Sequence, residues 1–136
     1  LLRHGEKHSV IPVFLEMIEA GRLGGVVIDT GDWWDLGTRE AYLDAHLAIA
    51  GTAFPRHLGS QTEDWQRPVS PNARVAEDAE IDTASSVCDS ATIGGGAKLI
   101  NSIVWPGAEV ASGTVLERCI IRQNQAAEGE LRDRDV

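Results

Sequence analysis

The residues best suited to chemistry lie between Gly31 and Thr38, in the order Gly31-Asp-Trp-Trp-Asp-Leu-Gly-Thr38. Two adjacent tryptophans, Trp33 and Trp34, place large rings on opposite faces of an extended segment. Asp35 follows these rings, and Thr38 is positioned to cap a helix over residues 39–50 that Gly51 would end. Taken alone, a single carboxylate in such a turn is more often a capping or turn residue than a metal ligand.

The histidines offer a second possible chemistry. His4 and His8 are four residues apart and could present two imidazoles on one helix face as metal ligands. No obvious third ligand accompanies them, so a solvated, charged segment is the simpler interpretation. We expect His46 to be a hydrogen-bonded histidine on the packed side of its helix, and His57 to be solvated.

The two cysteines, Cys88 and Cys119, suggest packing more than chemistry. No Cys-x-x-Cys pair occurs, which disfavours a structural zinc site. Two cysteines in a chain of this size are more simply buried small hydrophobic residues than a disulfide. This usage favours a reducing, cytoplasmic setting.

A repeat of six residues sets the architecture over residues 69–121. Each repeat begins with an aliphatic residue, and a small residue follows four places later. The first residues are Val69, Val75, Ile81, Val87, Ile93 and Leu99, then, after a step shortened by one, Val104, Val110 and Leu116. The small positions are Ala73, Ala79, Ser85, Ala91 and Ala97, then Ala108 and Thr114, with Ile120 in the next such slot. A period of six is wrong for a helix but suits a solenoid of short parallel strands with tight corners.

This spacing is typical of the hexapeptide-repeat, left-handed parallel β-helix, here with about three coils. Its left hand comes from the resemblance, since the general crossover rule favours the right hand. Ordinary antiparallel strands joined by turns are the alternative, and the long run of residues in register disfavours them. The sequence therefore predicts a mainly β protein.

A small α/β segment (helix, strand, turn, helix) is expected ahead of the β-helix. Its first helix carries an apolar stripe over residues 10–18 and ends at Gly21, with Ser9 as a plausible cap. The β-branched run over residues 23–29 predicts a strand. Residues 52–68 have no period and form a connector. The β-helix would cover 69–122, and the polar residues 123–136 would form a frayed or helical surface tail.

The composition of the chain disfavours two classes of partner, nucleic acids and membranes. The formal net charge of −9 disfavours nucleic acid, whose binding normally requires a basic face. No apolar run is long enough to span a membrane, and the first residues do not have the charged-then-apolar pattern of a leader. The first residue is not Met, so we expect a piece of a longer protein.

The run from Gly31 to Ala45 resembles the motif Gly-x-Trp-x-Asp-(Ile/Leu)-Gly-Thr-x-x-x-Tyr-Leu-x-Ala of sugar-1-phosphate nucleotidyltransferases. These enzymes include mannose-1-phosphate guanylyltransferases and their glucose and thymidylyl relatives. The helix and strand over residues 10–29 are similar to the region that precedes this motif. The segment over residues 101–110 is similar to the hexapeptide repeats of many members. The resemblance runs from about Glu6 to Arg122, and it identifies residues 1–51 as the end of the family's α/β catalytic domain.

The resemblance implies that Asp35 is one of two aspartates that hold the catalytic Mg²⁺, with Gly31, Trp33, Trp34, Gly37 and Thr38 adjacent to substrate. The family's second aspartate and its Gly-rich nucleotide loop have no counterpart in this sequence. One carboxylate does not hold Mg²⁺ usefully without a second acidic ligand and substrate phosphates. We therefore expect no catalytic residue, no cofactor and no sugar-nucleotide binding in this chain alone.

Three functions stay open. The first is the C-terminal portion of a nucleotidyltransferase, with a β-helix that serves assembly or regulation. The second is a free-standing, non-catalytic interaction module of the same descent. The third is a hexapeptide-repeat acyltransferase, which would use a histidine base on the β-helix, whereas residues 69–136 contain no histidine. Unpaired strand edges and an exposed apolar stripe also predict a homodimer or homotrimer.

Overall fold

The computed structural model describes residues 7–31, 33–49 and 68–136. The chain divides into two compact units, residues 1–33 and residues 34–136, which are described separately. The predicted connector over residues 52–68, including His57, lies outside the described residues except for Pro68. His4 and Asp32 lie outside them too.

The first unit contains helix α1 (Ile11–Glu19), with Pro12 in its first turn and Gly21 in a left-handed conformation after its end (φ +64°). The helix is present as expected, but Ser9 is not its cap: the N-cap is Val10, without a side-chain cap hydrogen bond, and the Ser9 hydroxyl accepts the Ile11 N–H at 3.3 Å. None of its residues is buried. Its apolar stripe is therefore open to solvent, with Ile11 and Ile18 more than half exposed.

The strand expected over residues 23–29 is wrong. The segment pairs with no other described residue, and Val26, Val27 and Ile28 are 79–87% exposed. β-branched residues favour extended backbone, but a strand needs a neighbour to accept and donate its backbone hydrogen bonds. The described part of the chain supplies no such neighbour.

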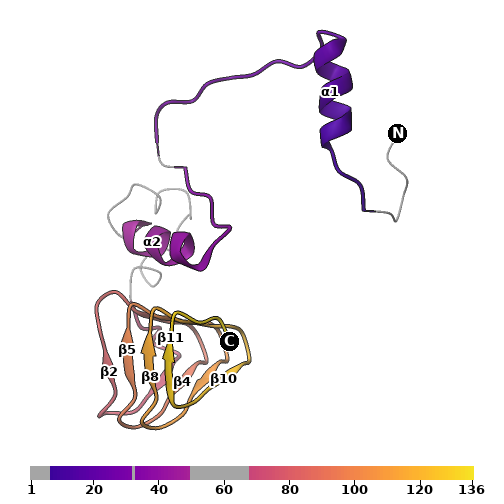
Figure 1. The fold of residues 1–136 in the computed structure, drawn as a ribbon. Coiled ribbons are helices and arrows are strands. Elements are labelled where there is room, and N and C mark those ends of the chain that lie inside the picture. Colours follow the sequence, from indigo (N-terminus) through magenta and orange to yellow (C-terminus); the bar gives the residue numbers. More distant parts are fainter. Residues whose placement is uncertain (1–6, 32, 50–67) are drawn as a thin grey trace. The chain divides into compact units, whose positions relative to one another are not determined.

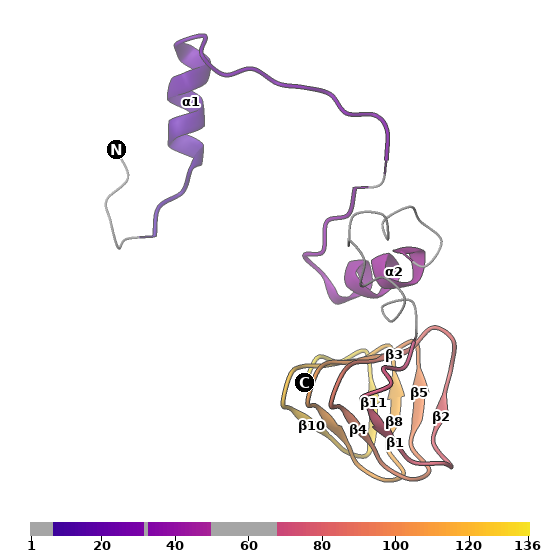
Figure 2. The same cartoon turned by 180° about the vertical axis from the view of Figure 1, so that it is seen from behind.

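The second unit is a parallel β-solenoid of about three turns, preceded by helix α2 (Arg39–Ile49). All its strand pairs are parallel, and its strands stack into three sheets in the orders β1-β4-β7-β10, β11-β8-β5-β2 and β3-β6-β9 (Figures 1 and 2). The bounds in chain order are β1 Arg74–Val75, β2 Glu80–Ile81, β3 Ser86–Val87, β4 Thr92–Ile93, β5 Lys98–Ile100, β6 Ile103–Val104, β7 Glu109–Val110, β8 Val115–Glu117, β9 Ile120–Ile121, β10 Ala126–Ala127 and β11 Glu130–Arg132.

The predicted aliphatic positions form the core in register. Val75 pairs with Ile93, and Ile93 with Val110; Ile81 pairs with Leu99, and Leu99 with Leu116. From the second coil onward these side chains are almost inaccessible: Ile93 and Val110 are each 2% exposed. Val75 is 36% exposed, because β1 is an edge strand of its sheet. The prediction of inward stacking is confirmed.

The step of five from Leu99 to Val104 recurs from Leu116 to Ile121, at the corner that leads into the sheet β3-β6-β9, whereas the first coil keeps six residues from Ile81 to Val87. Ser85, Ser102 and Cys119 occupy this corner in successive coils, 17 residues apart. The small slot assigned to Ile120 is therefore wrong by one position, since Cys119 takes the corner. Ile120 lies instead on the outer side of β9.

The same corner explains a second correction. With the step restored, Ile121 stacks on Val104, and the chain continues through β10 and β11, where Ala127 pairs with Val110 and Leu131 with Leu116. Residues beyond 122 thus extend the solenoid instead of forming a frayed or helical tail. The expectation of a constant period of six residues after Val104 is wrong, because shorter steps recur in the last coil.

Backbone polar groups at this corner are satisfied by side chains. The Ser85 hydroxyl accepts the Ser102 N–H at 3.0 Å, and the Ser102 hydroxyl accepts the Cys119 N–H at 3.0 Å. Asp82 accepts hydrogen bonds from the Ser85 hydroxyl (2.6 Å) and the Asn101 N–H (3.1 Å). These side-chain hydrogen bonds supply acceptors for the backbone N–H groups where the step is one residue shorter, because buried N–H groups need a partner. Neither described helix is long and apolar enough to cross a membrane.

Candidate functional site

The turn before α2 brings Asp35, Gly37 and Thr38 together. Asp35 Oδ1 accepts the Gly37 N–H at 3.1 Å, and Thr38 Oγ1 accepts the Ala41 N–H at 3.1 Å. Thr38 therefore caps α2, as expected. A Cβ added at Gly37 would lie 3.1 Å from Asp35 Oδ1. Because residue 37 is glycine and has no Cβ, the Asp35 carboxylate can lie against the backbone of the turn.

The remaining residues of the motif are less constrained. Trp34 is 41% exposed. Gly31, in a left-handed conformation (φ +102°), and Trp33, 84% exposed, belong to the other compact unit. The structure thus assembles only part of the motif, the turn from Asp35 to Thr38.

Asp35 fits a magnesium site only in part. It is exposed, and one of its oxygens is engaged by Gly37. Among the described residues no group of three His, Cys, Asp or Glu side chains could hold a metal ion. A hard divalent cation needs several oxygen ligands, so no reaction step can be derived through a metal from this chain's residues.

Helix α2 lies against the outer face of the sheet β3-β6-β9. Ile103 and Ile120 point outward from β6 and β9, yet they are only 2% and 5% exposed because Leu43 of α2, itself 1% exposed, packs on both. Tyr42 and Trp105 flank this cluster. The helix of the Gly-Thr motif and the solenoid are therefore one packed unit.

An ionic contact joins the start of α2 to the last coil. The Arg39 guanidinium donates to the Asp133 carbonyl and lies 3.7 Å from the Asp133 carboxylate. Arg118 contacts the same carboxylate at 3.2 Å. Glu40, beside Arg39, has a lowered pKa because its carboxylate accepts its own backbone N–H and faces Arg39.

A cavity of about 280 Å³ lies where the turn meets the solenoid, lined by Thr38, Arg39, Tyr42, Trp105 and Arg122 among others. Its two arginines already have partners: Arg39 contacts Asp133, and Arg122 contacts Asp135 at 3.1 Å. The cavity therefore presents no unpaired cation to an anionic ligand.

This contact was missed at the sequence level, although a signal existed. Ile103-Val104 and Ile120-Ile121 are apolar doublets, whereas most strands of the repeat alternate an apolar residue with a polar one. Two successive apolar residues on a strand indicate that both faces are covered. The covering element, α2, could not be identified from the doublets alone.

The remaining candidates are His46 and the two cysteines. His46 was expected on the packed side of its helix, but it is exposed. Partial desolvation lowers its pKa. Cys119 is fully buried and Cys88 half-buried, and both are free. Burial, together with the nearby Asp89 carboxylate, raises the pKa of the Cys88 thiol.

Comparison with known proteins gives two weak relatives, both glucose-1-phosphate adenylyltransferases. The protein of Parafrankia sp. (strain EAN1pec) is 28% identical over 138 positions, which cover 89% of this chain and 33% of the relative. That of Acidothermus cellulolyticus is 28% identical over 131 positions, covering 87% of this chain and 31% of the relative. The chain thus spans about a third of the length of these relatives. No family model and no solved structure matches it. The similarity to sugar-1-phosphate nucleotidyltransferases is confirmed.

Proposed function

We propose that this chain is the C-terminal portion of a sugar-1-phosphate nucleotidyltransferase. The complete enzyme would transfer a nucleoside monophosphate from a nucleoside triphosphate to a sugar-1-phosphate and release pyrophosphate. The observation that carries the proposal is the packing of α2 on the solenoid through Leu43, Ile103 and Ile120. It fixes the Asp35–Thr38 turn to the β-helix as one unit. The two similar adenylyltransferases support the same class of reaction.

In this proposal Asp35 is one magnesium ligand of the complete enzyme, and the chain alone is inactive. Bound Mg²⁺ would neutralise charge that develops on the transferred phosphate. This chain's own contribution is to hold the Asp35 carboxylate in a defined turn, through Gly37 and the capped helix. The β-helix would serve assembly or regulation, in a cytoplasmic protein.

The test is a coupled pyrophosphate-release assay with glucose- or mannose-1-phosphate, ATP, GTP or dTTP, and Mg²⁺. The chain alone should give the background rate. Turnover that is lost in Asp35→Ala would contradict its inactivity. In the natural full-length protein, Asp35→Asn should lower kcat by about a hundredfold, since a metal supplies several kcal/mol of charge stabilisation. Glu40→Gln, which removes a nearby exposed carboxylate, is the matched control.

A non-catalytic interaction module is the alternative, and the Asx turn at Asp35 favours it. A carboxylate that accepts the N–H two residues on does what a purely structural aspartate does. If the natural full-length protein shows no pyrophosphate release with any of these substrates, this alternative replaces the enzymatic one. The acyltransferase alternative has no such support, because residues 69–136 contain no histidine.

A further inference from the structure

Helix α2 contacts the solenoid at a second place, one turn before Leu43. Arg39 and Leu43 are four residues apart, so they lie on the same face of the helix. Leu43 packs on β6 and β9, whereas Arg39 reaches the last coil, where its guanidinium donates to the Asp133 carbonyl and lies 3.7 Å from the Asp133 carboxylate. Because Arg39 is the first residue of α2, this second contact directly follows the turn from Asp35 to Thr38.

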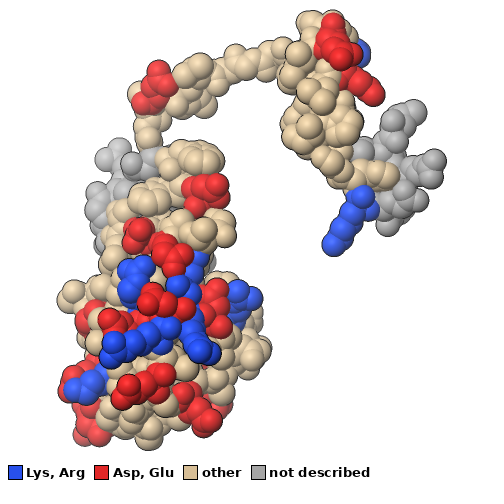
Figure 3. All heavy atoms as spheres, in the orientation of Figure 1, with Lys and Arg blue, Asp and Glu red and all other residues tan. Residues whose placement is uncertain are grey.

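The solenoid fixes the position of Asp133. This residue follows β11 at the corner that Asn101 and Arg118 occupy in the preceding coils, and all three have a left-handed backbone (φ +50°, +44° and +54°, respectively). Aspartate and asparagine adopt this conformation more readily than most residues. Arg118 contacts the Asp133 carboxylate at 3.2 Å from the neighbouring coil, and Figure 3 shows acidic and basic side chains intermingled on the solenoid. Asp133 is therefore a fixed anchor for Arg39.

The contact of Arg39 adds a direction that the contact of Leu43 lacks. Hydrophobic burial is not directional, so the Leu43 cluster by itself leaves the helix free to tilt. A hydrogen bond from a guanidinium is directional, because its N–H groups form a rigid fork. Glu40 contacts Arg39 as well, but both residues belong to the first turn of α2, so this pair does not tie the helix to the solenoid. The contact with Asp133 therefore fixes the end of α2 that follows the Asp35 turn.

We propose that Arg39 is a positioning residue for Asp35: it holds the first turn of α2 against the last coil of the solenoid and thereby orients the Asp35 carboxylate. We call the contact of Arg39 and Arg118 with Asp133 the clamp. This role rests on the proposed function, in which Asp35 is a magnesium ligand of the complete enzyme. The nucleotidyltransferase motif leaves position 39 unspecified, so the resemblance assigns no role to this arginine.

Short hydrogen bonds connect the clamp to the carboxylate. The Gly37 N–H donates to Asp35 at 3.1 Å, and the Ala41 N–H donates to Thr38 at 3.1 Å. The turn also lies against the last coil, since Gly37 and Thr38 line one cavity together with Asp135. A tilt of the first turn of α2 would therefore displace the carboxylate that the turn carries.

The first experiment is NMR-detected amide exchange of the full chain, measured at Gly37 and Ala41. Arg39→Gln should accelerate exchange at both amides by about fivefold, as expected for loss of an exposed ionic contact. Asp133→Asn should act in the same direction by a smaller factor, because the carbonyl acceptor remains and asparagine tolerates the left-handed backbone. Arg39→Lys, which keeps the charge but not the fork, should give an intermediate rate. Amides after Leu43 should stay protected.

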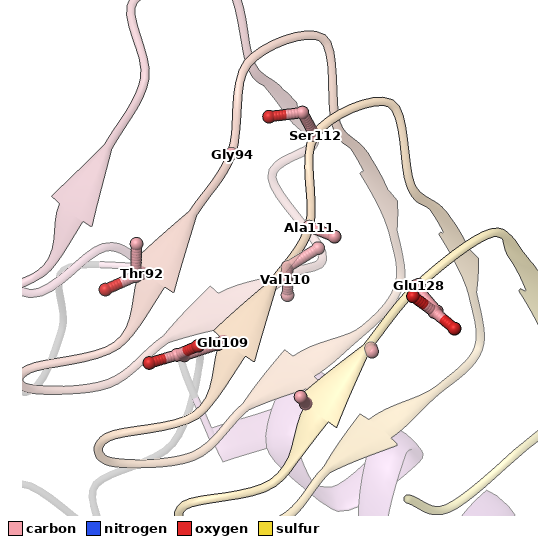
Figure 4. Close-up of a pocket in the computed structure, with 9 residues that line it drawn as sticks. Thr92, Gly94, Glu109, Val110, Ala111, Ser112 and Glu128 are labelled. Atoms are coloured by element: carbon pink, nitrogen blue, oxygen red, sulfur yellow. The ribbon is translucent and has the colours of Figure 1, made fainter.

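Two variants are matched controls for the change of charge. Arg122 lines the same cavity but pairs with Asp135 within the solenoid at 3.1 Å. Glu109 lies on the sheet β1-β4-β7-β10, at the groove that Figure 4 shows. Arg122→Gln and Glu109→Gln should leave exchange at Gly37 and Ala41 unchanged. Unchanged exchange in Arg39→Gln would overturn the proposal, and equal acceleration in the controls would do so too.

The second experiment measures pyrophosphate release by the natural full-length protein as a function of Mg²⁺ concentration. Arg39→Gln should raise the Mg²⁺ concentration for half-maximal rate by about tenfold and leave KM for the sugar-1-phosphate unchanged, because Asp35 would act on the metal alone. A merely structural loss would lower the rate without changing the Mg²⁺ requirement, and that result would overturn the positioning role. Absence of turnover in the unaltered protein would contradict the proposed reaction, whereas exchange at Gly37 and Ala41 would still decide whether Arg39 holds the turn.

Discussion

The rings of Tyr42 and Trp105 lie with their centroids 6.2 Å apart and their planes tilted by 56°. Tyr42 belongs to α2, and Trp105 follows β6 of the solenoid. Tilted aromatic pairs at this separation are favourable beyond the area they bury. The contact extends the Leu43 cluster and joins the motif helix to the β-helix.

Detaching α2 should be possible without unfolding the solenoid. Leu43→Ala removes the side chain that covers Ile103 and Ile120, and should cost about 2–4 kcal/mol of docking free energy. Hydrogen exchange should then show faster exchange of α2 amides, with the solenoid strands still protected. Leu47→Ala, at a position 43% exposed, is the control. Unchanged protection of α2 in Leu43→Ala would show that the docking does not depend on this cluster.

Core truncations should dominate solenoid stability. Ile93→Ala should lower the free energy of unfolding by about 2–4 kcal/mol, and Val110→Ala by somewhat less, because both side chains are buried in stacked coils. Changes at Glu77 and Asp78, both exposed, should stay within about 0.5 kcal/mol. Urea denaturation measures all four. Larger losses at the exposed pair would refute the observed stacking.

Two glycines should respond to alanine for different reasons. At Gly94 an added Cβ would lie 2.5 Å from the backbone nitrogen of Ser112 in the next coil, so the coils must separate. We expect Gly94→Ala to cost about 1–3 kcal/mol. At Gly96 the space is open, but φ is +66°, which predicts a cost of about 1–2 kcal/mol from backbone strain. A crystal structure of Gly94→Ala with unchanged coil spacing would contradict the steric account.

The serine ladder makes Ser102 more important than its size suggests. Ser102→Ala leaves the buried Cys119 N–H without its acceptor and should cost about 1–3 kcal/mol. Ser112→Ala, at an exposed position, should be nearly neutral. Thermal melts of the two variants decide the matter, and equal melting temperatures would show that another group satisfies the Cys119 amide.

Alkylation of Cys88 should be slow at neutral pH. Its raised pKa keeps the thiol protonated, and only the thiolate reacts rapidly with iodoacetamide. Burial and the Asp89 carboxylate both disfavour the charged thiolate, so the reactivity of Cys88 should rise only at a higher pH than that of a solvent-exposed thiol. Asp89→Asn removes a nearby negative charge and should shift the profile to lower pH. Rapid labelling of Cys88 at pH 7 would contradict the burial of this side chain.

Sequence alone determined the solenoid, because its core is made by a local period. Each of Val87, Ile93 and Leu99 is buried by its equivalents one coil away, so the repeat that generates the strand also generates its partner. The cap at Thr38 was equally local, since Thr38 Oγ1 and the Ala41 N–H are three residues apart. The resemblance carried by the Asp35 motif likewise needed only contiguous residues.

Tertiary structure decided what depends on distant partners. The apolar run at Val26–Ile28 formed no strand, because strand formation needs a neighbour that no local pattern supplies. Ile103 and Ile120 point outward from the solenoid, and only the tertiary structure shows that α2 covers them. The last coil, β10 and β11, was identified only from the strand register of the structure. At the shortened corners the Ser85 and Ser102 hydroxyls accept backbone N–H groups of the next coil, and a fixed spacing of six residues does not predict these hydrogen bonds.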